Sequence, residues 1–163
     1  MKISHDFLRS ILNYSPETGL FEWKISKGTK KVGSIAGAIN RTGYFAITID
    51  KHRYLSHRLA WFYFYGVWPN EDVDHKNRVR TDNRIANLRL ASKSQNQFNS
   101  SIRKDNTSGY KGVYYCAREG KYLAQIMVNR KRISLGYHTS AIDAHRAYQK
   151  ASLTYHGEFS SEQ

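Results

Sequence analysis

The chain has 163 residues, a length that allows one ordinary domain or two small ones. Its 26 lysines and arginines stand against 13 acidic residues, so the formal net charge is +13 at neutral pH. A charge of this size attracts polyanions, and nucleic acid is the partner that it favours. The alternatives are a basic surface that is merely solvated and, with less support, one that binds a membrane.

Targeting and redox features exclude further classes of protein. The most apolar stretch, residues 59–68, has roughly half the length that a bilayer span requires. The N-terminal residues show neither the apolar segment nor the cleavage site of a secretory signal. We therefore expect a cytoplasmic protein with no membrane partner.

Cys116 is the single cysteine, which excludes an internal disulfide and a zinc site built from paired cysteines.

The N-terminal half predicts short helices and strands. Residues 4–13 carry apolar residues at helical spacing, which predicts a short helix. Residues 20–23 and 43–49 are rich in aromatic and β-branched residues and predict strands. A tight turn then leads to a partner strand at 52–56, and the apolar run 59–64 predicts a buried helix. We interpret this region as a β-rich scaffold.

The C-terminal part has a different pattern. A polar stretch at 92–109 indicates a helix end followed by a linker. Three strand-like runs come next, at 112–115, 122–128 and 132–135. Residues 140–157 begin with a serine cap and carry apolar residues at helical spacing. Together these runs predict a three-stranded antiparallel sheet with one helix packed across it.

Short polar segments between the two halves carry a family resemblance. They are 73–77 (VDHKN), 83–89 (NRIANLR) and 92–96 (SKSQN), with 14–19 and 57–61 upstream. These segments resemble the phage-type HNH endonuclease family. In that family an Asp-His pair ends one strand, an asparagine lies in the loop, and a histidine or asparagine lies on the following short helix. The resemblance covers most of residues 10–100 and implies a ββα-metal nuclease module.

Hydrolysis of a phosphodiester requires a water deprotonated near neutral pH, a counter-charge, and stabilisation of the leaving oxygen. Asp74 and Asn96 offer hard oxygen ligands, which suit Mg²⁺ and also Mn²⁺. His75 follows Asp74 on an extended strand, so the two side chains diverge and His75 can act as the general base. The resemblance implies that Asn87 braces the loop and holds the imidazole in one orientation.

Local sequence also places the proposed metal ligand on a helix. Ser92 and Gln95 form a capping box, which predicts that a helix begins there with Asn96 in its first turn. The simpler interpretation is that the Asp74 and His75 pair is a hydrogen-bonded surface pair. On that view the asparagines are ordinary loop and cap residues.

The motif departs from the family pattern at two positions. Asn77 is followed by Arg78, where family members often carry glycine, and a non-glycine at positive φ costs about 1 kcal/mol. We therefore expect a remodelled turn. The last position is Asn96 instead of histidine, which favours oxygen coordination of Mg²⁺. Arg58 could clamp the scissile phosphate, or it could equally snorkel or pair with an acidic neighbour.

The C-terminal segments 109–113, 121–126, 135–137 and 143–148 resemble an AP2/ERF-type DNA-binding domain. The resemblance covers about residues 108–158. It implies that the sheet lies in the major groove of DNA while the helix supports its back.

Individual contact residues follow from this second resemblance. Lys111 and Arg132 match basic contact positions, and Tyr122 matches an aromatic one. Tyr114, Arg118 and Lys121 are further candidate contacts because of their location in this region. The alternative is that the tyrosines are cross-strand packing pairs and that the basic residues are only solvated.

The sequence thus predicts an α+β protein. We expect a nuclease domain at 1–100, a linker at 101–108 and a DNA-binding domain at 109–160. The expected activity is metal-dependent nicking or cutting of double-stranded DNA by a homing-type enzyme in a phage-infected cell, without a small-molecule cofactor. A monomer or weak dimer is expected, and a monomer with one active site would nick. The alternatives are a DNA-binding regulator with an inactive HNH module and an intron- or capsid-associated binding protein without chemistry.

Overall fold

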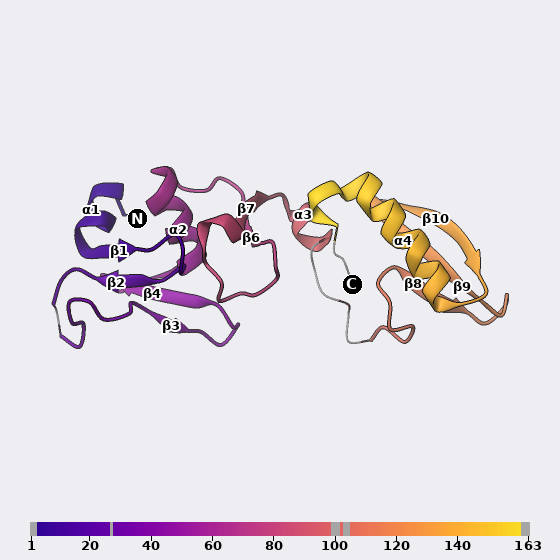
Figure 1. Cartoon of the computed structure of the whole chain (residues 1–163), viewed down its shortest axis with the longest axis horizontal. Coiled ribbons are helices and arrows are strands. Elements are labelled where there is room, and N and C mark those ends of the chain that lie inside the picture. Colours follow the sequence, from indigo (N-terminus) through magenta and orange to yellow (C-terminus); the bar gives the residue numbers. More distant parts are fainter. Residues whose placement is uncertain (1–2, 27, 99–101, 103–104, 161–163) are drawn as a thin grey trace. The chain divides into compact units, whose positions relative to one another are not determined.

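The computed structural model describes residues 3–26, 28–98, 102 and 105–160. The chain divides into two compact units, residues 1–93 and 94–163 (Figure 1). In the predicted linker, residues 101, 103 and 104 lie outside the described residues, and the predicted domain limits stay a prediction. No helix in the described part of the chain is both long enough and apolar enough to cross a membrane.

The first unit mixes helices with short antiparallel strands, as the sequence predicted. The strand pairs are β1–β2, β3–β4–β5 and β6–β7. The elements in chain order are α1 (His5–Ile11), β1 (Leu12–Tyr14), β2 (Phe21–Trp23), β3 (Ala38–Ile39), β4 (Phe45–Ile49), β5 (His52–Leu55), α2 (Ser56–Tyr65), β6 (Asp72–His75), the 3₁₀ helix η1 (Ile85–Asn87) and β7 (Leu88–Ala91). Helix α3 (Lys93–Phe98) follows across the division between the units.

Helix α1 is shorter than its apolar spacing predicted. It begins after Ser4, whose hydroxyl accepts a hydrogen bond from the Phe7 amide at 3.2 Å. The predicted helix extended to residue 13, but Leu12 already lies in β1, opposite Trp23 of β2. Pairing with the next strand, β2, replaces the last helical turn, because both Leu12 and Trp23 become buried there.

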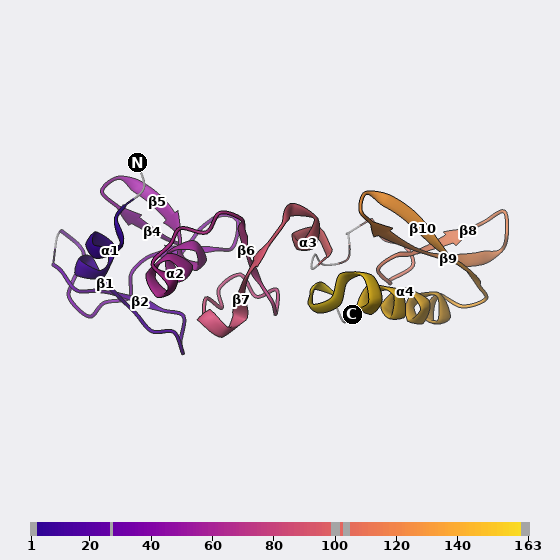
Figure 2. The same ribbon diagram turned by 90° about the horizontal axis from the view of Figure 1, so that it is seen from above.

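Helix α2 positions the strand that carries the candidate site. Asp50 and Lys51 form the predicted tight turn between β4 and β5, with φ values of 44° and 67° that match the twist of a two-residue hairpin. Helix α2 then ends at Gly66, whose φ of 74° allows a left-handed cap. The helix lies against β4, β5 and β6 (Figure 2). Leu59 and Ala60 are fully buried in this core.

The second unit contains the predicted three-stranded sheet and helix. The strand order is β10-β9-β8, and both pairs are antiparallel. The elements are β8 (Val113–Cys116), β9 (Lys121–Val128), β10 (Lys131–His138), α4 (Ala141–His156) and the 3₁₀ helix η2 (Gly157–Phe159). Strand β10 extends beyond the predicted 132–135, with an irregular register between Ser134 and Tyr137.

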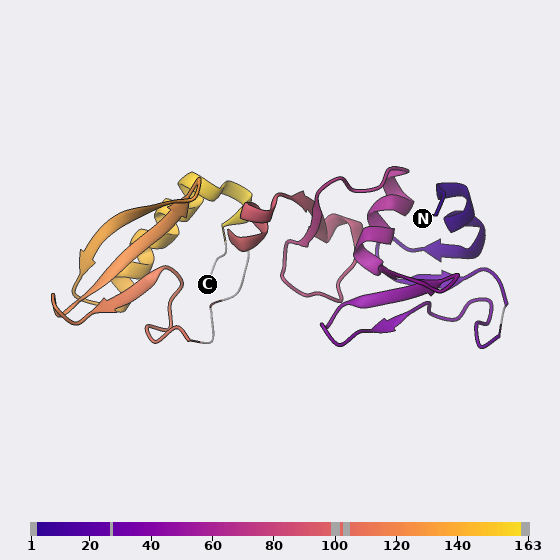
Figure 3. The same cartoon turned by 180° about the vertical axis from the view of Figure 1, so that it is seen from behind.

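Helix α4 lies across one face of this sheet (Figure 3). Ser140 caps it as predicted, by accepting a hydrogen bond from the Asp143 amide at 3.2 Å. Gly112 allows the close approach, because a Cβ at this position would lie 2.1 Å from the Tyr148 ring and its φ is +72°. The arrangement agrees with the fold expected for this region, while its specific likeness to an AP2/ERF domain stays a prediction.

Candidate active site at strand β6

The candidate site is built on the β6–β7 hairpin of the first unit. Strand β6 pairs antiparallel with β7, so that Asp74 lies opposite Arg89 and His75 lies opposite Leu88. Asp74 is 8% exposed and His75 is 4% exposed. The pair is therefore not the surface pair of the simpler interpretation, because both side chains are almost fully removed from solvent.

The Asp74 carboxylate is held by an arginine that the sequence did not single out. Arg89 donates hydrogen bonds to Asp74 Oδ2 from Nε at 3.1 Å and from Nη2 at 3.0 Å. Both side chains are 9% exposed, so the ion pair is buried. Leaving either charge without the other would cost several kcal/mol at such a site. Arg89 thus compensates the charge of the buried carboxylate.

The His75 imidazole is held by Asn83, a second residue that the sequence gave no role. His75 Nε2 lies 3.0 Å from Asn83 Oδ1, and Asn83 is only 2% exposed. The Tyr14 hydroxyl of β1 in turn donates to the Asn83 backbone carbonyl at 2.7 Å. With Oδ1 as acceptor, Nε2 carries the proton and Nδ1 keeps the lone pair that a general base needs.

Burial also keeps this imidazole neutral. Desolvation lowers the pKa of His75, while the Asn83 hydrogen bond and the charge of Asp74 oppose that shift. The desolvation effect is the larger, because the charged imidazolium loses its hydration in the interior. His75 is therefore in its proton-accepting form at neutral pH.

Asn87 makes hydrogen bonds within the loop between β6 and β7, where the family resemblance implied a bracing role. Its Oδ1 accepts from the Asn77 amide at 3.0 Å, and its Nδ2 donates to Asn77 Oδ1 at 3.0 Å and to the Asp82 carbonyl at 2.8 Å. Hydrogen bonds from Arg84 lower the pKa of Asp82 to about 2. The imidazole of His75 is hydrogen-bonded to Asn83 Oδ1 and not to Asn87, so the two asparagines contact different parts of the site.

The turn after the Asp-His pair keeps a left-handed residue without glycine. Arg78 has a φ of 62°, and its amide donates to the His75 carbonyl at 2.9 Å. The backbone therefore retains a conformation that favours glycine, and the arginine adopts it at a cost of about 1 kcal/mol. The expected remodelling of this turn does not occur at Arg78.

A second histidine lies against the candidate base. The His57 ring meets the His75 ring edge to face at a centroid distance of 5.0 Å, and Tyr44 lies 5.3 Å from His57. His57 is 5% exposed, and its Nδ1 has no hydrogen-bond partner among the described residues. Burial, followed by the neighbouring His75 and Arg58, lowers the pKa of His57 to about 3. The His57 ring is therefore neutral and packs directly against the imidazole of His75.

The lowered pKa of His57 predicts a pH dependence of folding stability. A histidine in the unfolded chain titrates near 6.5. Because the folded pKa of His57 is about 3, the unfolded chain binds more protons between pH 3 and 6.5, and stability should fall as the pH decreases through that window. The contribution should reach about 1.4 kcal/mol per pH unit. Urea unfolding between pH 4 and 7 should show a shallower dependence for His57→Gln, and no such change for the exposed His52→Gln.

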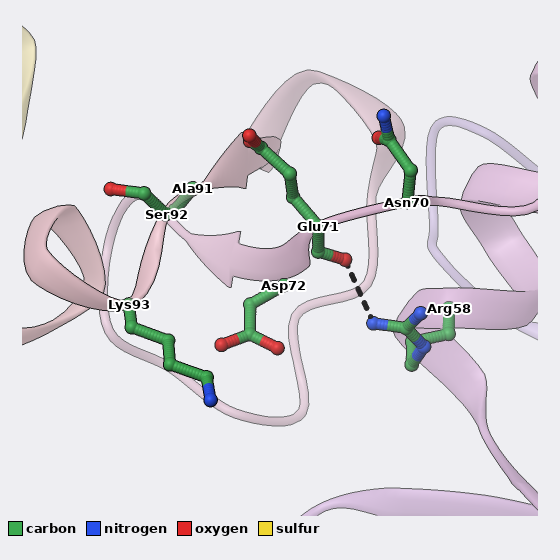
Figure 4. Close-up of a pocket in the computed structure, with 7 residues that line it drawn as sticks. All are labelled: Arg58, Asn70, Glu71, Asp72, Ala91, Ser92 and Lys93. Carbon is green, nitrogen blue, oxygen red and sulfur yellow. Dashed lines mark hydrogen bonds between the residues drawn. The ribbon is translucent and has the colours of Figure 1, made fainter.

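Arg58 lines a pocket at the other end of the hairpin. Its guanidinium donates to the carbonyl oxygens of Glu71 and Pro69, both at 3.0 Å. Figure 4 shows the guanidinium directed at the Glu71 backbone. The pocket has a volume of about 300 Å³ and is lined by Arg58, Asn70, Glu71, Asp72, Ala91, Ser92 and Lys93. The Arg58 guanidinium is thus hydrogen-bonded to backbone carbonyls of the first unit. Its role as a phosphate clamp stays a prediction.

The two predicted metal ligands lie on β6 and on α3. Helix α3 begins at Lys93, so Ser92 precedes it and Asn96 lies at its fourth residue, as predicted. Across 3–26, 28–98, 102 and 105–160, no three side chains of His, Cys, Asp or Glu lie together as a possible metal site. Asp74 and Asn96 stay the predicted ligands, and their carboxylate and amide oxygens are of the kind that Mg²⁺ prefers.

The predicted DNA contacts lie in several different settings on the second unit. Cross-strand partners point to the same side of a sheet. Tyr114 pairs with Leu123, Arg132 pairs with Met127, and Lys121 shares the β9 face of Leu123 and Met127. Tyr114, Lys121 and Arg132 therefore lie on the face away from α4.

Tyr122 lies on the opposite face. It packs against the core formed by Val113, Ala124 and Ala144, and its ring meets Tyr115 at 5.2 Å. This setting agrees with the packing alternative for Tyr122. Arg118 lies in the turn between β8 and β9 and pairs with Glu119 at 3.0 Å.

Comparison with known proteins matches the segment that contains the site. The HNH endonuclease family profile matches residues 54–98. Among solved structures, the chain is similar to one described as "DNA binding and cleavage by the HNH homing endonuclease I-HmuI", with 18% identity and a TM-score of 0.45. That similarity covers 96% of this chain and 91% of the other. No curated protein matches the chain. The family match includes Asp74, His75, Asn87 and Asn96, and it ends before the sheet of the second unit.

Proposed function

We propose that this chain is a metal-dependent HNH endonuclease that hydrolyses phosphodiester bonds in duplex DNA, leaving 5′-phosphate and 3′-hydroxyl ends. One observation carries this proposal. Asp74 and His75 occupy adjacent buried positions of β6, inside the segment that matches the HNH family. The net charge of +13 supports a polyanionic substrate. A homing-type role in a phage-infected cell belongs to the same proposal.

His75 is the general base in this mechanism. Its neutral imidazole takes a proton from the attacking water, and Asn83 is the positioning residue that keeps the proton on Nε2. Asp74 and Asn96 are the proposed metal ligands. A bound Mg²⁺ or Mn²⁺ would neutralise charge on the phosphate and stabilise the leaving 3′-oxygen. Asn87 keeps the loop between β6 and β7 in shape.

A second candidate function has a specific observation in its favour. The carboxylate of Asp74 is already neutralised by Arg89 in a buried ion pair. A carboxylate engaged in this way can be purely structural. The chain would then be a DNA-binding regulator with an inactive HNH module.

A plasmid-nicking assay distinguishes the two functions. We expect the purified full chain to convert supercoiled plasmid to the open-circular form in Mg²⁺ or Mn²⁺, and to stop when EDTA is added. A monomer with one active site should accumulate nicked product before linear product. DNA binding in a gel-shift assay, without nicking in either metal, would establish the regulator instead.

We further propose that the second unit recognises DNA through Lys111, Tyr114, Arg118, Lys121 and Arg132. The support is the basic character of the sheet. Strands β8, β9 and β10, all described, contain Lys121, Lys131 and Arg132 and no acidic residue. Lys121 and Arg132 are both exposed, so they can reach phosphates without a change of fold.

This proposal predicts a change in the salt dependence of DNA affinity. Each phosphate contact that is removed should take about 0.9 from the slope of log affinity against log salt concentration. Lys121→Gln with Arg132→Gln should therefore reduce the slope by about 2. The exposed Lys150 of α4 provides the control. An equal slope for the double variant and for Lys150→Gln would contradict DNA contact by this face.

A further inference from the structure

The sheet face away from α4 combines basic and apolar side chains. We call this surface the open face and define it by Tyr114 of β8, Leu123 and Met127 of β9, and Arg132 and Tyr137 of β10. Tyr114 and Tyr137 both pair with Leu123, and Arg132 pairs with Met127, so these side chains point to one side.

The apolar members of the open face are unusually exposed. Tyr114 is 56% exposed, Tyr137 49% and Met127 42%. The opposite face of the same sheet buries Val113, Ala124 and Ile126 almost completely. The polar pair Gln125 and Ser134 lies between Leu123 and Met127 on this face. Exposed apolar side chains gathered on one face of a sheet indicate a binding site, because leaving them in water is unfavourable.

Charge decides which partner fits this surface. Lys121 and Arg132 flank the apolar row, and no acidic residue lies in the three strands. A polyanion is therefore favoured over an ordinary protein surface or a second copy of this chain. The remaining requirement is a polyanion that also presents apolar groups to a flat sheet.

Thymine in duplex DNA meets this requirement. The major groove accepts β-strands, and the thymine C5-methyl is the apolar group that base edges present there. We propose that the open face of β8, β9 and β10 recognises thymine methyl groups in the major groove, with Tyr114, Leu123, Met127 and Tyr137 as their contacts. This inference rests on the proposed DNA binding of the second unit.

The methyl group can be removed without changing anything else in the partner. Uracil has the hydrogen-bonding groups of thymine, and the phosphate charge stays the same. A random-sequence duplex pool is first enriched for binding to the full chain in EDTA, and the bound sequences are then copied with either thymine or uracil. Each buried methyl should contribute about fourfold to affinity. We therefore expect the thymine copy to bind several-fold more tightly.

Variants of the open face assign that difference to the proposed contacts. Tyr114→Ser with Tyr137→Ser should bring thymine and uracil affinities closer together, and the exposed Tyr155→Ser of α4 should leave the ratio unchanged. Folding of each variant is verified by its thermal unfolding. A lower affinity for both copies with an unchanged ratio would overturn the inference.

Two further results would overturn the inference of thymine recognition, and they can be distinguished from each other. Equal affinity of the wild-type chain for both copies would remove methyl recognition while leaving the proposed DNA binding intact. Failure to bind either copy would remove DNA recognition by the chain altogether. In that case, self-association measured by sedimentation, and lost in the Tyr114→Ser, Tyr137→Ser variant, would assign the open face to a second copy.

Discussion

Replacing His75 by alanine should lower the rate of DNA nicking by about a hundredfold to ten-thousandfold, the usual contribution of a general base. The imidazole is neutral because burial lowers its pKa. Its Nε2 lies 3.0 Å from Asn83 Oδ1, and this contact favours the tautomer that is protonated at Nε2. Rates are measured under single-turnover conditions with saturating Mg²⁺. An unchanged rate in His75→Ala, with no ionisation in the pH profile near histidine values, would remove His75 from the mechanism.

Asn83 provides a more specific test of the same mechanism. Asn83→Asp places a carboxylate at the atom that accepts from His75 Nε2, which should favour the protonated imidazole and raise its pKa. The acid limb of the pH–rate profile should therefore move to higher pH. The exposed Asn13 of β1 is the matched control, since Asn13→Asp adds the same charge to the neighbouring scaffold. If Asn83 has a purely structural role, Asn83→Asp would lower the nicking rate without moving the acid limb of the pH–rate profile.

Replacing Asp74 should abolish nicking, because it is the proposed carboxylate ligand of the metal. The structure determines which substitution is informative. Asp74→Ala would leave Arg89 charged and buried, at a cost of about 3–5 kcal/mol in stability. Loss of activity in that variant could then result from unfolding. Asp74→Asn keeps an oxygen that can accept from Arg89 while removing the negative charge.

We therefore expect Asp74→Asn to lose nicking in both Mg²⁺ and Mn²⁺ while it still binds DNA in EDTA. Thermal unfolding shows whether the variant remains folded. Asp72→Asn, on the same strand but exposed, should retain nicking and serves as control. Nicking at the wild-type rate by a folded Asp74→Asn would exclude Asp74 as a metal ligand.

Local chemistry in the sequence predicted much of the secondary structure. The aromatic and β-branched runs became β4, β9 and β10, and the serine at 140 starts α4 as predicted. These features depend on neighbouring residues, such as an alternating pattern or a cap three residues from its donor, so they can be inferred without the fold. The spacing of the Asp-His pair and the later asparagines likewise led to the family that matches residues 54–98.

The partners of the candidate site depended on the tertiary structure. Arg89 meets Asp74 because the β6–β7 register places them opposite each other. Asn83 contacts His75 through its side chain, and its backbone carbonyl accepts from the Tyr14 hydroxyl of β1, 69 positions away. No local pattern contains these separations.

The tertiary structure also decided on which side of the sheet each strand residue lies. Tyr114 and Tyr122 looked equivalent as candidate DNA contacts, yet α4 covers the side of the sheet on which Tyr122 lies. The sequence alone determined which residues could form strands and a helix, and it singled out the Asp-His pair that we propose as catalytic. Only the pairing register and the position of α4 decided which side chains are buried and which face solvent, because both depend on contacts between segments distant in sequence.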